Sequence, residues 1–160
     1  MVRTKAMLLI LLLVCSVVMP AVAQQKNTIE GVWRMISGKE DGKERLTPST
    51  SDVKYITSKH WIFIYQDKAK TTAALANTQG DPLKAFTDAF GAGSGSYSLK
   101  GNTYTETIEH FVDPSYIGLS ISFNVKLEGN RLYQSGKFPV FENGKRIKEV
   151  LLEEIYERVE

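Results

Sequence analysis

The chain has 160 residues, with 20 basic and 18 acidic side chains, two histidines and one cysteine. This length fits one domain with a core of its own. No basic stripe with interleaved aromatic residues is present, so the composition argues against nucleic-acid binding.

The N-terminal segment 1–23 has the three parts of a secretory signal peptide. Arg3 and Lys5 make a positive start, an apolar run covers 8–18, and an Ala-Val-Ala motif ends at Ala23. The apolar run is shorter than the roughly 20 residues that a membrane-spanning helix needs. We therefore expect cleavage after Ala23, a secreted or periplasmic protein, and no membrane span after cleavage.

The expected mature domain, 24–160, is electrically neutral and free of cysteine. Loss of Arg3 and Lys5 leaves eighteen basic and eighteen acidic residues, and Cys15 lies inside the signal segment. The mature domain therefore has no disulfide available. Its stability must come from the burial of apolar side chains, for which 137 residues suffice.

Short strand-like runs separated by turn signals follow through most of this domain, which is typical of an all-β barrel or sandwich. The predicted strands cover Val32–Ser37, Val53–Thr57, His60–Gln66, Tyr97–Leu99, Thr103–Phe111, Leu119–Leu127, Arg131–Ser135, Val140–Phe141 and Glu149–Val159. Gly101–Asn102, Gly129–Asn130 and Asn143–Gly144 suit two-residue hairpins, which need positive φ angles. Because hairpins join sequence neighbours, we expect a single antiparallel up-and-down β-barrel of about eight to ten strands.

The segment from Ala69 to Gly93 breaks the strand pattern. Asp81 is a good N-cap, and Pro82 suits the first position of a helix. Apolar residues then fall at helical spacing, at Leu83, Phe86 and Phe90. We predict a helix over 82–90 and a further helical turn over 71–76.

Two roles are open for this helical insertion, since a barrel with an apolar interior has an open end to cover. It is either a plug that completes the core or a movable lid over a cavity, in which case Phe86 contacts a ligand. The glycines and serines of 93–96 are expected to form a flexible lead-in to the next strand.

The stretch Gly31-Val32-Trp33 begins the first predicted strand and suggests how the barrel closes. The glycine allows close approach of the backbone at the barrel floor, and the tryptophan is a large flat plug. The first and last strands of a closed barrel are neighbours, so Arg158 can stack its guanidinium on Trp33. We expect Gly31, Trp33 and Arg158 to close the barrel.

The candidate ligand-binding residues share the inward faces that period two gives to these strands, if Tyr104 and Arg158 point inward. They are Trp61, Phe63, Tyr65, Tyr104, Glu106, Ile108, His110, Glu154 and Tyr156, with Phe86 from the helix. Both faces of the strand 60–66 are apolar, so Trp61, Phe63 and Tyr65 suit core packing as well as a cavity wall. Inward Glu106 and Glu154 would need partners or shifted pKa values. They bind a polar head group, form an internal network or, on the opposite face, meet water.

Four stretches of the chain resemble small bacterial exported proteins with a lipocalin-like domain of unknown function, within the wider calycin pattern. They are GVWRMISG (31–38), GSYSLKGNTYTETIEH (95–110), FNVKLEGNRLYQSG (123–136) and LLEEIYERV (151–159). The resemblance implies a calycin-type β-barrel. The chain departs from typical lipocalins in its lack of a disulfide and in its helical insertion.

Three functions are consistent with these features. The leading one is an exported protein that binds a small, largely apolar ligand inside the barrel, without catalysis or a cofactor. The second is an interaction or envelope-associated scaffold that uses loops 38–52 and 112–118. The third is a hydrolase or isomerase at the barrel mouth that uses Glu106, Glu154 or His110. The sequence has no nucleophile elbow and no histidine series for a metal, so we assign no catalytic or metal residue, and no pattern indicates an oligomeric state.

Overall fold

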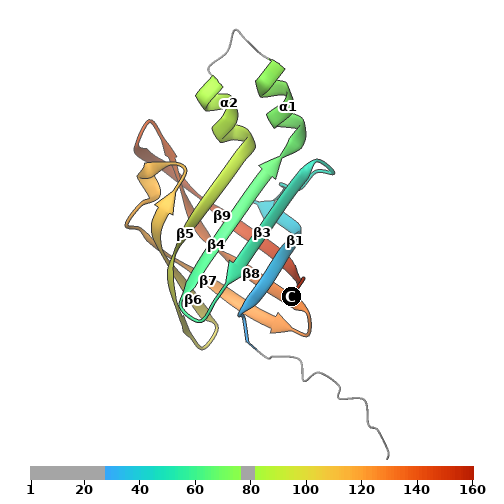
Figure 1. Ribbon diagram of the computed structural model, residues 1–160. Coiled ribbons are helices and arrows are strands. Elements are labelled where there is room, and N and C mark those ends of the chain that lie inside the picture. Colours follow the sequence, from blue (N-terminus) through green and yellow to red (C-terminus); the bar gives the residue numbers. More distant parts are fainter. Residues whose placement is uncertain (1–27, 77–81) are drawn as a thin grey trace, which may run out of the picture.

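The computed structural model describes residues 28–76 and 82–160. Eight antiparallel strands form a closed up-and-down barrel, which confirms the expected fold class (Figure 1). The strands are β1 (Gly31–Glu40), β2 (Lys43–Glu44), β3 (Thr50–Ile56), β4 (His60–Asp67), β5 (Phe90–Lys100), β6 (Thr103–Phe111), β7 (Ser120–Glu128), β8 (Arg131–Glu142) and β9 (Lys145–Arg158). The helices are α1 (Lys68–Ala76), α2 (Pro82–Ala89) and the 3-10 helix η1 (Pro114–Tyr116). The short β2 pairs with the end of β1 and lies outside the eight-strand wall.

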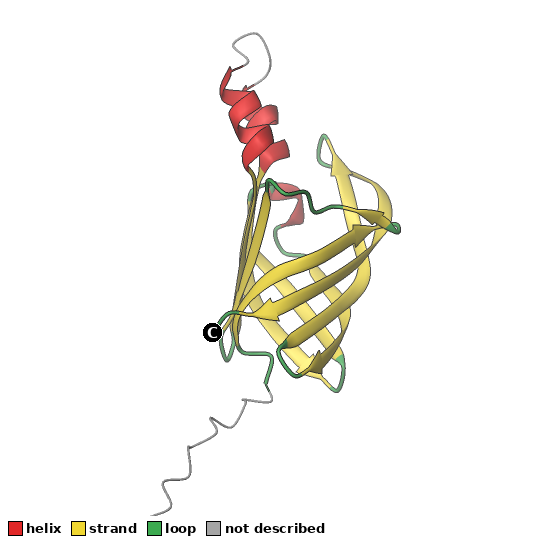
Figure 2. Ribbon diagram, turned by 90° about the vertical axis from the view of Figure 1, so that its right-hand side faces the viewer, coloured by secondary structure: helices red, strands yellow, loops and turns green. Residues whose placement is uncertain are grey.

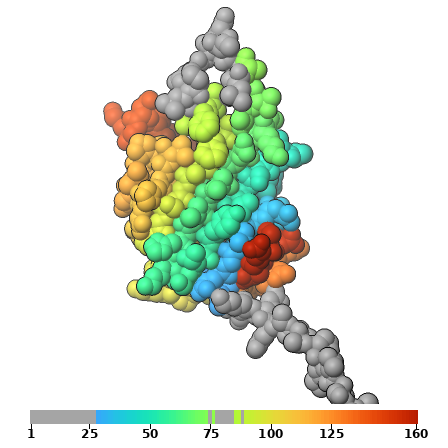
Figure 3. Space-filling view, viewed as in Figure 1, coloured from blue at the N-terminus to red at the C-terminus, as the bar shows by residue number. Residues whose placement is uncertain are grey.

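The wall closes because β1 pairs with β9. The register runs from Trp33 opposite Arg158 to Glu40 opposite Leu152, with a bulge after Met35. Every other strand of the wall pairs with the next one along the chain, as hairpins require. In the space-filling view the red C-terminal end lies directly against the blue β1 (Figure 3). We call the β1–β9 pairing the seam.

Local turn chemistry explains the hairpins. Gly101 and Gly129 each have a φ of 58°, and in the β8–β9 turn Asn143 and Gly144 have φ angles of 51° and 73°. Asp41 and Gly42 repeat the second arrangement between β1 and β2, with φ angles of 48° and 76°. These are conformations in which glycine and asparagine cost little, so the turns fix the register of the strands that they join.

Two strands are longer than the sequence pattern predicts, because they continue through glycines. β5 begins at Phe90 and includes the Gly-Ser segment 93–96, so the expectation of a flexible lead-in there is wrong. A Cβ on Gly93 would lie 2.6 Å from the Phe111 ring, and one on Gly136 in β8 would lie 2.7 Å from the Ser122 carbonyl oxygen. These glycines therefore let neighbouring strands and rings approach inside the sheet.

The core fills much of the barrel interior. On β7, Ile121, Phe123 and Val125 are buried while Ser122 and Asn124 between them are exposed, as strict alternation requires. The largest fully buried side chains come from six different positions around the wall: Trp33, Trp61, Tyr104, Ile108, Leu132 and Tyr156.

Both predicted helical segments are present. α1 follows Asp67, whose carboxylate Oδ1 accepts hydrogen bonds from the amides of Ala69 at 3.0 Å and Lys70 at 3.2 Å. The hydrogen bond that the Ser49 hydroxyl donates to Asp67, together with those from these amides, holds the pKa of Asp67 below its usual range. α2 begins at Pro82 as expected, and its predicted cap Asp81 lies outside the described residues.

The position of the two helices differs from both expected roles. They stand beyond the ends of β4 and β5, pack mainly on each other, and do not fold across the barrel opening (Figure 2). In this arrangement the insertion does not plug the barrel, and it does not cover the barrel opening. The short helix η1 lies at that end of the barrel instead, where it places the buried Tyr116. We call this end the mouth, and the end that holds Trp33 the floor.

Candidate functional site

The floor is held by Trp33 and Arg158. Trp33 is fully buried, and the guanidinium carbon of Arg158 lies 4.1 Å from the centroid of the indole ring. The indole Nε1 donates a hydrogen bond to the carbonyl of Ile29 at 2.7 Å. Arg158 also donates to the carbonyls of Thr28, at 2.6 Å, and Glu30. This stack ties the segment before β1 to the end of β9.

Gly31 makes room for the stack. Its φ of 143° is a conformation that side-chain-bearing residues rarely adopt. A Cβ at this position would overlap the Arg158 guanidinium and the Glu160 carbonyl oxygen. A glycine is therefore needed at the start of β1, because the Arg158 guanidinium and the Glu160 carbonyl oxygen approach its backbone closely, as the sequence predicts.

A cavity of about 290 Å³ lies above this floor. Along β9 the inward residues above Arg158 are first polar, at Tyr156 and Glu154, and then apolar, at Leu152 and Val150. The polar lining consists of Glu40, Arg45, Asp52, Lys54, Glu106, Gln134, Glu154 and Tyr156. Most of the apolar lining is aromatic, from Trp61, Phe63, Phe111, Tyr116, Phe123 and Phe138. The cavity thus combines charged and polar side chains with aromatic rings, and we call its charged and polar members the polar layer.

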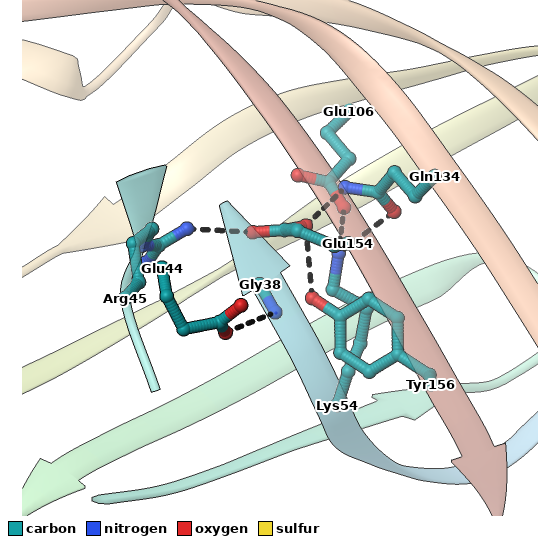
Figure 4. A network of polar contacts seen from close by, with 8 residues as sticks. All are labelled: Gly38, Glu44, Arg45, Lys54, Glu106, Gln134, Glu154 and Tyr156. Carbon is teal, nitrogen blue, oxygen red and sulfur yellow. Dashed lines mark hydrogen bonds and ion pairs between the residues drawn. The ribbon is translucent and has the colours of Figure 1, made fainter. Parts of the chain in front are cut away.

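Lys54 on β3 is the buried cation at the centre of the polar layer. Only 4% of it is exposed, and its Nζ donates hydrogen bonds to Glu106 Oε1 at 3.0 Å and to Gln134 Oε1 at 3.1 Å (Figure 4). Burial by itself lowers the pKa of Lys54, but the carboxylates of Glu106 and Glu154 outweigh burial and raise it above the usual value. Lys54 therefore remains charged inside the barrel.

Glu154 on β9 is the second centre of the network. Its Oε2 accepts hydrogen bonds from Gln134 Nε2 at 3.1 Å and from the Tyr156 hydroxyl at 3.0 Å. Its Oε1 accepts one from Arg45 Nη1 at 2.9 Å (Figure 4). Burial and the adjacent Glu154 carboxylate raise the pKa of Tyr156 well above its usual value. The phenol therefore stays protonated and acts as a donor.

Asp52, two residues before Lys54 on β3, is the third buried carboxyl group that lines the cavity. It is 5% exposed, and no described residue donates a hydrogen bond to its Oδ1. Burial first, and then repulsion from Glu154, raises its pKa to about 7, against the opposing attraction of Lys54 and Arg45. This carboxyl therefore changes charge near neutral pH.

The mouth is lined by rings that gather around Tyr116. Its ring centroid lies 4.5 Å from that of Phe111, 5.2 Å from that of Phe138 and 4.9 Å from that of Phe141. The Tyr116 hydroxyl donates to the carbonyl of Pro139 at 3.0 Å. η1 thus brings an aromatic side chain from the β6–β7 connection into contact with β8.

Six of the candidate residues line the cavity: Trp61, Phe63, Glu106, Ile108, Glu154 and Tyr156. Tyr104 is buried in the core beside Tyr97, with 5.1 Å between the ring centroids, and does not line the cavity. Tyr65 is half-buried and also lies outside the lining. Phe86 is 48% exposed on α2, where it packs on Phe90 away from the cavity.

His110 is not on the inner face of β6, so its expected inward orientation is wrong. Ser94 pairs with His110 but the next residue, Gly95, pairs with Ile108, so a bulge inserts Glu109 into β6. The bulge moves His110 from the inner to the outer face. There its Nδ1 lies 3.2 Å from the Ser94 hydroxyl, in an exposed position.

Sequence reasoning missed five residues of the polar layer, Glu40, Arg45, Asp52, Lys54 and Gln134. On β3 the hydrophobic signal comes from Val53 and Tyr55, yet Tyr55 is 43% exposed, and Asp52 and Lys54 point inward. One signal was present: two inward glutamates need buried cations as partners. Arg45 follows β2 in a loop, where no periodicity marks its direction.

Within residues 28–76 and 82–160, no three His, Cys, Asp or Glu side chains gather so as to hold a metal ion. No helix among these described residues has the length and apolar character to cross a membrane.

No family model matches this sequence, and a search of curated proteins found no match for it either. The structure itself shows a closed antiparallel barrel of eight strands, which is compatible with a lipocalin-like fold.

Proposed function

We propose that this chain is an exported, lipocalin-like protein that loses residues 1–23 and binds a small molecule inside its barrel. The cavity of about 290 Å³ carries the proposal. An eight-stranded barrel has room for its own side chains and one small ligand, and here the inner side chains leave that room open.

The lining supports a ligand with a largely apolar body. Phe63, Phe111 and Phe138 offer flat apolar surface toward the mouth, and Val140 and Leu152 continue it. Burial of apolar ligand surface against such residues contributes about 25 cal/mol per Å². The few polar groups of the polar layer then set the orientation of the ligand, as they do in most small-molecule sites.

The other two functions considered from the sequence have less support. The scaffold was tied to a solid interior, whereas this barrel is hollow. The enzyme was expected to use Glu106, Glu154 or His110; His110 lies outside the wall, and the two glutamates are held by hydrogen bonds from Lys54, Gln134 and Arg45. Binding in the cavity is therefore the function that the geometry favours.

The first test is to purify the exported protein from its host, measure its intact mass under native conditions, and extract it with organic solvent. We expect a recurring small molecule at one per chain. Titration of the extracted protein with that molecule should change the emission of Trp61, which lines the cavity.

A blocked variant makes the test specific. Val140→Trp places a large ring among the residues that line the cavity, and it should abolish binding. Lys137→Trp adds the same ring to the outer face of β8 and should leave binding unchanged. Equal binding by both variants, or no bound molecule together with no response to lipid, retinoid, haem-like or aromatic probes, contradicts the proposal.

A further inference from the structure

The polar layer contains a hydrogen-bond acceptor to which none of the residues that the structure describes donates. The buried cation Lys54 is already engaged with Glu106 at 3.0 Å, and the partly buried Arg45 with Glu154 at 2.9 Å. Asp52 Oδ1 has no donor among the described residues, although Asp52 is 95% buried and lines the cavity. Buried acceptors are nearly always paired, so this oxygen points to a partner that enters from outside.

The charge of the layer indicates what kind of partner. Asp52, Glu106 and Glu154 are three carboxyl groups against two cations, Lys54 and Arg45. When Asp52 is ionised, the layer carries one negative charge that nothing balances, and a buried unbalanced charge is costly. The half-exposed Glu40 at the cavity edge adds a further negative charge. A cationic ligand relieves this imbalance, whereas an anionic one increases it.

We propose that the barrel binds a small primary amine whose ammonium group pairs with Asp52 and whose apolar or aromatic body lies among the rings toward the mouth. This inference rests on the proposed function and names its ligand class. An ammonium group supplies up to three donors as well as the positive charge that the layer lacks. The cavity volume of about 290 Å³ corresponds to a body of on the order of ten non-hydrogen atoms, at roughly 30 Å³ for each water-sized unit.

The pairing makes binding depend on pH. Asp52 is faced by Glu154 from β9 and Glu106 from β6, which disfavour its ionisation, and by Lys54 and Arg45, which favour it. Tyr65, opposite Asp52 on β4, is a neutral phenol whose pKa burial and the nearby Asp67 raise further. With the pKa of Asp52 at about 7, the ionised fraction grows about tenfold between pH 6 and pH 8. An alkyl ammonium stays charged throughout, as lysine does, so amine affinity should rise about tenfold over this interval.

Three probes of one shape test the head group: 2-phenylethylamine, 2-phenylethanol and phenylacetate. Each is titrated by calorimetry into the exported protein after solvent extraction, at pH 6 and at pH 8. We expect the amine at pH 8 to bind at least tenfold more tightly than the alcohol, and phenylacetate to bind more weakly than both.

Two variants locate the preference. Asp52→Asn keeps the shape of the side chain but removes its charge, so it should lose both the preference for the amine and the rise with pH. Glu153→Gln removes one carboxylate from the exposed face of β9 and should retain both. If Asp52→Asn fails to fold, the pH dependence of the unmodified protein decides.

The outcomes separate this inference from the proposed function. Binding of the alcohol or phenylacetate as tight as that of the amine, or amine affinity that does not change between pH 6 and pH 8, overturns the ammonium site and leaves a cavity that binds small molecules. A co-purified ligand without a cationic group does the same. Failure of all three probes, with no co-purified ligand, overturns the ammonium site, and it overturns the proposed function as well if the lipid, retinoid and haem-like probes also give no response.

Discussion

The raised pKa of Asp52 predicts how the stability of the ligand-free protein changes with pH. Its pKa is about 7 in the folded protein against 3.8 as the ordinary value, because burial disfavours the carboxylate. Between these two pH values the folded state keeps a proton that the unfolded state has released. The free energy of unfolding therefore falls as the pH rises from about 4 to 7, and stays reduced above pH 7.

The size of the effect follows from the shift. Each pKa unit corresponds to 1.36 kcal/mol, so a shift from 3.8 to about 7 sets an upper limit of about 4 kcal/mol. Asp52→Asn removes the ionisable group and should restore part of the free energy of unfolding that is lost above pH 7. The recovery is partial because burial of the amide has its own desolvation cost. A gain of about 2 kcal/mol corresponds to a rise in melting temperature of roughly 4–8 °C for a chain of this size.

The assay is thermal unfolding of the extracted protein, followed by circular dichroism at pH 4 and pH 8. Asp52→Asn should melt higher than the unmodified protein at pH 8 and within a degree or two of it at pH 4. Glu153→Gln, which removes an exposed carboxylate, should change neither temperature appreciably. A variant at position 52 that is less stable than the unmodified protein at pH 8 would refute the reasoning, because the carboxylate would then have a stabilising partner.

Two further predictions concern the floor and the polar layer. Gly31→Ala should destabilise the protein by more than about 2 kcal/mol, since the added Cβ would overlap Arg158. Gly42 also has a positive φ but has open space around it, so Gly42→Ala should cost about 1 kcal/mol. Urea unfolding of both variants measures these losses, and equal losses would contradict the close approach at Gly31. Lys54→Met should cost about 3–5 kcal/mol because Glu106 is left unpaired. Addition of Glu106→Gln should then recover part of that loss, and a purely additive double variant would show that the pair is not coupled.

The barrel was predictable because its signals are local. Glycine–asparagine turns, strict alternation along β7 and the cap and proline around the helices each act over a few residues. The closing contact was also accessible, since Trp33 and Arg158 mark the two strands that must meet when a meander closes. These features need no knowledge of distant packing.

The rest depends on which residues meet across strands. Gly93 and Gly95 resemble a flexible segment until Phe111 and Thr107 are placed beside them, and the bulge at Glu109 that turns His110 outward has no local marker. The sequence did not indicate which face of β3 points inward, because the apolar Tyr55 lies on the outer face and the polar Asp52 and Lys54 lie on the inner one. Cavity volume is the sum of many such side-chain placements, so no short pattern contains it.

The seam has a consequence for how quickly the protein loses its structure. Arg34 and Glu157, which bond across the seam, are 123 positions apart along the chain, whereas the other strand pairs of the wall join successive strands. Such distant pairing demands the greatest loss of chain entropy, so we expect it to form after the hairpins during folding. Contacts made late chiefly slow unfolding. The lifetime of the native barrel should therefore be governed at the seam, even though its equilibrium stability is spread over the whole wall.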